Sequence, residues 1–162
     1  MTKDAPMDSP KAPPEIDRFD AAIIRELAGD GRMAVTELAR RIGLSKTPTQ
    51  ARVKRLEATG VIAGYRAVLN PIRIGLAHVA FVEVRLSDTR EAALQAFNRA
   101  VQGVPEIEEC HMMASSFDYL LKVRTGDISA YRRVLGERIS TLPHVASTST
   151  YVAMEAVKEA GL

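Results

Sequence analysis

Residues 35–59 read VTELARRIGLSKTPTQARVKRLEAT and predict two short helices that meet at a tight turn. In the first helix, Leu38, Ala39 and Ile42 fall on one apolar face. Gly43 is placed to end this helix, because glycine takes the left-handed conformation after a helix at little cost. This spacing is typical of a helix-turn-helix.

The second helix is predicted to begin after Ser45, whose hydroxyl we expect to cap it. Pro48 lies in its first turn, where a missing N–H leaves no hydrogen bond unmade. On a helical wheel, the inward face is formed by Thr49, Val53 and Leu56. We therefore expect the helix to pack on a small helical domain and to leave its other face in solvent.

The outward face of the second helix mixes amide, hydroxyl, small and cationic side chains, which suit base edges and phosphates in a major groove. It consists of Thr47, Gln50, Ala51, Lys54 and Arg55, with Lys46 and Arg52 on its flanks. We predict that DNA is contacted by these residues together with Arg40, Arg41 and Ser45.

Positive charge is concentrated in this part of the chain. Residues 32–66 carry eight Arg or Lys against two Glu, a net charge of +6, whereas residues 1–31 carry −3 and residues 67–162 carry −1. The overall charge of +2 therefore hides one basic patch. The alternative interpretation is an ordinary amphipathic helix pair with a solvated basic face. The patch lies on the second helix of the predicted pair, which we call the reading helix, and this position favours DNA binding.

Length and composition exclude several classes of protein. A chain of 162 residues with 46% apolar residues can form one domain or two small ones. Its apolar runs are too short to cross a bilayer, and no secretory signal is visible. A single cysteine, Cys110, excludes an internal disulfide and fits a reducing cytoplasm. The absence of tryptophan disfavours a surface that stacks single-stranded bases.

We expect four segments. Residues 1–15 contain four prolines among polar neighbours and predict a flexible tail. Residues 16–76 form the helix-turn-helix domain, in which Val61–Leu69 is expected to be an extended β segment and Pro71–Leu76 the hinge to the next domain. Residues 77–157 form a second domain, and residues 158–162 a C-terminal tail.

In the second domain, the apolar residues change to the alternation of strands. Four strands are predicted, at residues 79–86, 106–113, 117–124 and 145–157. One helix follows the first strand, capped by Asp88 with Glu91, and another follows the third, capped by Asp127. The order β-α-β-β-α-β predicts a ferredoxin-like domain, and an α+β fold for the whole chain.

Both helices of such a domain cover one face of the sheet, and Val79 and Phe81 leave its other face partly apolar. A second copy of the chain, packed sheet against sheet about a two-fold axis, would bury this face. A dimer of this kind presents two reading helices to successive turns of DNA, about 34 Å apart.

From about Asp17 to Lys158 the chain resembles the Lrp/AsnC, or feast/famine, family of transcriptional regulators. The stretches that carry the resemblance are IDRFDAAIIREL, DGRMAVTELARRIGLS, RVKRLEATGVIAGYRAVLNP, FDYLLKVR, DISAYRRVLGERISTLPHV and TSTYVAMEAVK. The reading helix is similar to those of leucine-responsive regulators and of the subgroup that activates proline dehydrogenase expression. The resemblance implies a winged-type helix-turn-helix acting on the bacterial nucleoid, and a ligand-binding domain that dimerises and often forms octamers of four dimers.

The resemblance also implies no cofactor, but a small amino-acid effector such as leucine or proline, bound between dimers near the loop that joins the second and third strands. Carried over by position, the effector contacts are Met112, Ser115, Ser116, Asp118, Ile128 and Tyr151. Asp118 is the candidate partner of an ammonium group. The loop departs from the family pattern Gly-Asp-Phe-Asp-Tyr, because Ser115 and Ser116 replace the glycine and the first acid.

Three functions remain open. The chain is a sequence-specific regulator of amino-acid metabolism, an effector-independent architectural DNA-binding protein, or a metabolite-binding enzyme domain with incidental basic helices. Ser115, His111 and Asp118 lie close in sequence, but nothing supplies an oxyanion hole. No two of the histidines and Cys110 have metal-ligand spacing. We therefore predict neither a catalytic nor a metal site.

Overall fold

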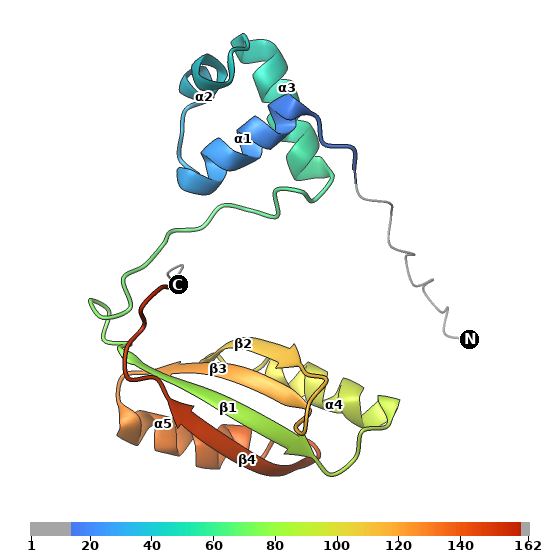
Figure 1. Cartoon of the computed structure of the whole chain (residues 1–162), viewed down its shortest axis with the longest axis vertical. Helices are drawn as coiled ribbons and strands as arrows, with labels where there is room; N and C mark the ends of the chain where they lie inside the picture. The colour runs from blue at the N-terminus through green and yellow to red at the C-terminus, as the bar shows by residue number, and fades with distance from the viewer. Residues whose placement is uncertain (1–13, 160–162) are drawn as a thin grey trace. The chain divides into compact units, whose positions relative to one another are not determined.

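The computed structural model describes residues 14–159. Most of the predicted N-terminal tail (1–13) and the end of the C-terminal tail (160–162) lie outside the described residues. The contacts of the chain divide it between Ala67 and Val68 into a helical unit and a sheet unit (Figure 1). Within the described residues, no helix is both long and apolar enough to cross a membrane.

The helical unit contains α1 (Arg18–Gly29), α2 (Val35–Ile42) and α3 (Lys46–Ala58). Asp17 caps α1 in a capping box with Asp20, in which each carboxylate accepts a backbone N–H from the other residue. One apolar side chain from each helix is fully buried at the centre: Ile23, Leu38 and Leu56. The predicted helix-turn-helix is therefore confirmed, with α1 as its support.

The turn between α2 and α3 forms as expected at one end only. Gly43 ends α2 in the left-handed conformation, with φ of 71°. Ser45 is the N-cap residue of α3, but its side chain makes no capping hydrogen bond, so this prediction is wrong. Pro48 occupies the third helical position and has no N–H, which removes one of the two donors that an N-cap side chain usually binds. Instead, the hydroxyl of the buried Thr49 donates to the carbonyl oxygen of Ser45 at 2.9 Å.

The strand predicted at Val61–Leu69 is not formed in the described structure, where this segment is extended but pairs with no strand. The strand predicted for this segment is therefore wrong for the single chain. Val61 and Ile62 at its start pack against the core of the helical unit, whereas Tyr65, Val68 and Leu69 are exposed. The Tyr65 hydroxyl donates to the Glu57 carboxylate at 2.9 Å.

The sheet unit has the predicted ferredoxin-like order. Its elements are β1 (His78–Leu86), α4 (Glu91–Val101), β2 (Ile107–Met112), β3 (Tyr119–Thr125), α5 (Ile128–Val134), the π-helical turn η1 (Leu135–Ile139) and β4 (Val145–Val152). The sheet is antiparallel, with strand order β2-β3-β1-β4. The last strand ends at Val152, five residues earlier than predicted.

The main core lies between one face of this sheet and the two helices, which Figure 1 shows on the same side. Alternate residues of β1 point into it, among them Ala80, Val82 and Val84, each fully buried. Phe97 of α4 and Tyr131 of α5 cover them. The period-two pattern of the sequence thus set the buried face correctly.

Of the two predicted helix caps in the sheet unit, one forms and one does not. Asp127 caps α5 as predicted, accepting the Ala130 N–H at 2.7 Å. Asp88 does not cap α4, because the N-cap residue is Arg90, two residues later. Asp88 instead binds the backbone and guanidinium of Arg90. Ile128, one of the predicted effector contacts, is 55% exposed at the first position of α5.

Candidate DNA interface and effector region

The outward face of α3 is open to solvent. Thr47, Gln50, Ala51 and Lys54 are exposed, whereas Thr49 and Leu56 on the opposite side are fully buried. The helix therefore has the amphipathic division that its sequence predicted. Hydroxyl, amide and ammonium groups on an exposed helix are the donors and acceptors that base edges and phosphates require.

The two arginines of α2 are engaged with acids. Both Nε and Nη2 of Arg40 donate to the Glu37 carboxylate, at 2.8 and 2.6 Å. Arg41 donates to Glu37 at 2.8 Å and to Glu26 of α1 at 3.0 Å. Hydrogen bonds from Arg40 and then Arg41 lower the pKa of Glu37 to about 2.

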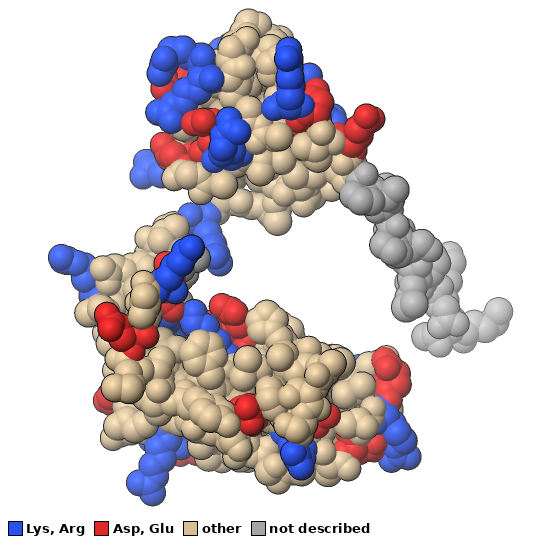
Figure 2. All heavy atoms as spheres, in the orientation of Figure 1, with Lys and Arg blue, Asp and Glu red and all other residues tan. Residues whose placement is uncertain are grey.

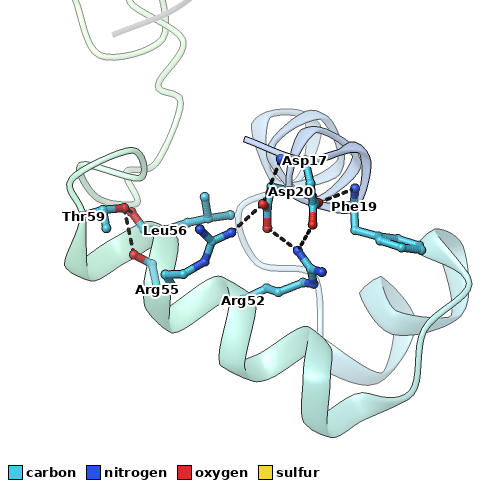
Figure 3. A network of polar contacts seen from close by, with 7 residues as sticks. All are labelled: Asp17, Phe19, Asp20, Arg52, Arg55, Leu56 and Thr59. Atoms are coloured by element: carbon cyan, nitrogen blue, oxygen red, sulfur yellow. Dashed lines mark hydrogen bonds and ion pairs between the residues drawn. The ribbon is translucent and has the colours of Figure 1, made fainter. Parts of the chain in front are cut away.

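The two arginines of α3 point toward α1 (Figure 3). Arg52 Nη1 donates to Asp17 at 2.6 Å and to Asp20 at 2.9 Å, and Arg55 donates to the other oxygen of Asp20. The Asp20 side chain is only 1% exposed. Burial by itself would raise the pKa of Asp20, but hydrogen bonds from Arg55, the Asp17 N–H and Arg52 lower it to about 2.

These ion pairs compensate part of the positive charge that the sequence count assigned to residues 32–66. Figure 2 shows basic and acidic side chains side by side on the helical unit. Asp17, Asp20 and Glu26 lie outside the stretch counted as +6, yet they bind its arginines. Among the described residues, Lys46 and Lys54 of α3 have no ion pair. The positive charge of α3 that is free of ion pairs is therefore smaller than the sequence count and lies at these two lysines.

In the sheet unit, the loop between β2 and β3 is tied to β1. The Asp118 N–H donates to the carbonyl of Val84 at 2.9 Å, and Asp118 Oδ2 accepts the N–H of Leu86 at 2.7 Å. Arg85 donates to the carbonyl oxygen of Ser116 at 2.6 Å. One oxygen of Asp118 is thus used structurally, and the other accepts no hydrogen bond from the described residues.

The serines that replace the usual glycine and acid do not strain this loop. Among the described non-glycine residues, only His144 has a positive φ. Ser115 and Ser116 therefore adopt conformations open to any residue, and both are exposed. The loop does not depend on a glycine in this chain.

One copy of the chain does not bring all six predicted effector residues together. Met112, Ser115, Ser116 and Asp118 lie at the end of the sheet where Tyr119 pairs with Val84. Tyr151 lies opposite Phe81, three residues along β1. Ile128 follows the end of β3, where Thr125 pairs with His78. His78 and Val84 are six residues apart on β1. At about 3.3 Å per residue, the end of the sheet near Ile128 is therefore about 20 Å from the β2–β3 loop.

The residues considered for catalysis have separate partners. His111 pairs with Glu109 at 3.1 Å, whereas Asp118 is bound to Leu86. Cys110 packs against the core, and burial raises the pKa of its thiol. Within residues 14–159, no group of His, Cys, Asp and Glu side chains is arranged to hold a metal ion.

Sequence reasoning missed the acidic partners of the arginines. The pairs between Glu37 and Arg40 or Arg41 have helical i,i+3 and i,i+4 spacing and were recognisable in the sequence. Asp20 lies 32 and 35 residues before its arginines, and only the packing of α3 on α1 joins them. Another missed group surrounds Arg124, which is 5% exposed and binds Glu108, Glu159 and the carbonyl of Leu76.

A helix-turn-helix with an exposed polar second helix, followed by a ferredoxin-like domain, defines a DNA-binding protein of the regulator class. Two family profiles match the chain: the AsnC-type helix-turn-helix domain over residues 16–57 and the Lrp/AsnC ligand binding domain over residues 79–162. The chain belongs to the Lrp/AsnC family of transcriptional regulators.

Three relatives span almost the whole chain. The proline dehydrogenase transcriptional activator of Rhizobium radiobacter is 60% identical over 148 residues, 91% of this chain and 95% of that protein. The leucine-responsive regulatory protein of Escherichia coli is 48% identical over 154 residues, 94% of each chain. A feast or famine regulatory protein from M. tuberculosis, solved in complex with L-methionine, is 34% identical, with a TM-score of 0.81 and coverage of 89% of this chain and 95% of that one.

Proposed function

We propose that this regulator controls the expression of proline dehydrogenase and acts in the bacterial cytoplasm on nucleoid DNA. The observation that carries the proposal is the 60% identity to a proline dehydrogenase transcriptional activator over nearly the full length of both chains. The exposed polar face of α3 supports it, because a regulator of one gene needs a surface that reads base edges.

For DNA, we propose a division of labour along α3. Thr47, Gln50 and Ala51 are placed to read base edges, and Lys46 and Lys54 to contact phosphates or guanine. Ser45, Arg40 and Arg41 flank this face and are candidates for backbone contacts. Arg52 and Arg55 belong to the same predicted set, but their ion pairs with α1 separate them from the others.

For the effector, we propose proline first and leucine second, at a site built by more than one copy of the chain. The M. tuberculosis relative was solved in complex with L-methionine, which supports an amino acid as the chemical class of the effector. The free oxygen of Asp118 is suited to an ammonium group. The distance of Ile128 from the β2–β3 loop supports contributions from two copies, and octamers of four dimers would supply such a contact.

The test combines binding with response. The full chain is titrated against a duplex from upstream of a proline dehydrogenase gene and a shuffled duplex, each with and without proline or leucine. We expect tighter binding to the upstream duplex and a shift caused by one amino acid. Thermal unfolding with each common amino acid identifies the effector, because a ligand that binds the native state raises stability. Equal binding to both duplexes would favour the architectural alternative.

A further inference from the structure

The side chain of Asp20 is the least exposed acid whose partners lie on the reading helix. It is 1% exposed, and both of its oxygens are used: Oδ1 accepts from Arg52, and Oδ2 accepts from Arg55 and from the Asp17 N–H (Figure 3). A buried carboxylate is strongly destabilising without compensating charge. The two arginines of α3 supply that charge.

Arg52 is held by more than one contact. Its guanidinium binds Asp17 as well as Asp20, and its Cζ atom lies 5.4 Å from the centre of the Phe19 ring. These three partners all belong to the start of α1 or its cap. Moving Arg52 toward a phosphate would break two ion pairs and a cation–π contact. Its position is therefore set by α1, not by the solvent-facing side of α3.

Arg55 is more exposed, at 45% of its side chain, but it also binds Asp20. Arg52 and Arg55 are three residues apart and so lie on one side of α3. Both pairs join this side to α1, while Gln50, Ala51 and Lys54 remain exposed. Because the pairs tie one side of α3 to α1, they act beside the buried Thr49 and Leu56 on the rotation of α3 about its own axis, which decides which side chains face outward.

We propose that Asp20 is a positioning residue for DNA recognition: through Arg52 and Arg55 it sets the rotation of α3 and keeps both guanidinium groups away from DNA phosphates. This inference rests on the proposed function, in which α3 reads duplex DNA. It predicts that the lysines of α3 neutralise phosphates while these two arginines do not. Two of the cations in the basic patch are then structural.

Salt dependence of binding counts phosphate contacts directly. Each phosphate neutralised contributes about 0.9 to the slope of log K against log salt concentration. The full chain and the single variants R52Q, R55Q and K54Q are titrated with the upstream and shuffled duplexes over a range of salt. We expect K54Q to make the slope less steep, by about 0.9. R52Q and R55Q should leave it unchanged, and a fall of that size in either would overturn the proposal.

Asp20→Asn tests the positioning role. The neutral amide no longer holds the arginines, so the slope for the shuffled duplex should steepen by up to about 1.8, as two further cations reach phosphates. The preference for the upstream duplex should fall at the same time. A variant with reduced thermal stability but with the parent slope and preference would show a merely structural acid and overturn the proposal. If this variant does not fold, the arginine variants decide.

The measurements distinguish failure of the proposed function from failure of the role of Asp20. A parent chain that does not prefer the upstream duplex contradicts the proposed function. A parent that does prefer it, combined with a lower slope for R52Q, contradicts only the role of Asp20. Asp17→Asn is the matched control, because Asp17 binds Arg52 but is 47% exposed and does not contact Arg55. We expect a smaller change in slope for it than for Asp20→Asn.

Discussion

The two units of this chain use polar and apolar residues in opposite ways. In the described helical unit, only three apolar side chains form the fully buried cluster, and arginine–carboxylate pairs join its helices. The sheet unit buries a cluster of fourteen residues, yet exposes large apolar side chains such as Phe81 and Tyr151. A small domain with little apolar core presents a polar surface suited to DNA. The sheet unit has a larger core and still exposes apolar side chains, which are available for association with another copy.

The difference in core size predicts the largest effect. Leu56→Ala removes one of three central side chains and should destabilise the helical unit by about 2–5 kcal/mol. DNA binding should be lost while self-association and the sheet unit persist. Leu121→Ala, at an equally buried position of the sheet unit, is the comparison. Circular dichroism melts should show selective loss in each variant, and a single shared transition would contradict the independence of the units.

The exposed apolar face of the sheet gives the next effect. Phe81→Glu places like charges across a two-fold interface and removes an aromatic anchor, which should weaken self-association by at least about 2 kcal/mol, roughly 30-fold. Sedimentation measures the change. Ala92→Glu, on the exposed surface of α4, is the control for added charge. Unchanged self-association in the Phe81 variant would show that another face of the sheet unit joins the copies.

On the polar side of the comparison, Gln50→Ala and Lys54→Ala should weaken binding to the upstream duplex by about 1–3 kcal/mol where a base contact is lost, and by less for a phosphate contact. Arg25→Ala removes an exposed cation from α1 and serves as the matched control. Fluorescence anisotropy gives the affinities. If both α3 variants bind like the control, the reading face has been assigned to the wrong side of α3.

Asp118 is the proposed contact of the effector and also holds the β2–β3 loop, so two substitutions are needed to separate these roles. Asp118→Asn keeps an oxygen for the Leu86 N–H but removes the charge, whereas Asp118→Ala removes both. If Asp118 binds an ammonium group, both variants should lose the effector's influence on DNA affinity, about 5- to 150-fold for a typical allosteric coupling. Dimers should persist. An Asn variant that still responds would restrict Asp118 to holding the loop.

The smallest expected effect is a pH dependence in the helical unit. Because the pKa of Asp20 falls from 3.8 to about 2 on folding, its pairs stabilise the unit above about pH 4 and are lost as the pH falls through about 2. The parent should therefore exceed Asp20→Asn in stability at pH 5, by on the order of 1–2 kcal/mol, and lose this advantage near pH 2. Thermal melts of both proteins across this range measure the difference. A gap that does not change with pH would show that the Asp20 charge contributes nothing.

Local rules predicted much of this fold. The alternation in β1, the positive φ of Gly43 and the cap at Asp127 each depend on a few neighbouring residues, and each is confirmed. The prediction of a strand at Val61–Leu69 was wrong because a strand also needs a neighbouring strand to pair with, and no local sequence pattern shows whether one is present. The predicted cap at Ser45 was also wrong, and Pro48 removes one of the two donors that such a cap usually binds.

For the candidate sites, too, features set by neighbouring residues were predicted, and features that depend on distant partners were not. The outward face of α3 follows from helical periodicity, and the sequence placed Gln50, Ala51 and Lys54 correctly in solvent. The partners of Arg52 and Arg55 lie on another helix, so the sequence could not show that these charges are compensated. The effector residues were carried over from a resemblance, and their separation within one chain depends on the register of the sheet.

The most direct test of the central claim, that the exposed face of α3 reads duplex DNA, is a comparison of two affinities at physiological salt. The full chain is titrated against the upstream duplex and against its shuffled counterpart. The account predicts a preference of at least about 10³-fold for the upstream duplex. Equal affinities, or no binding to either duplex at low salt, would contradict it.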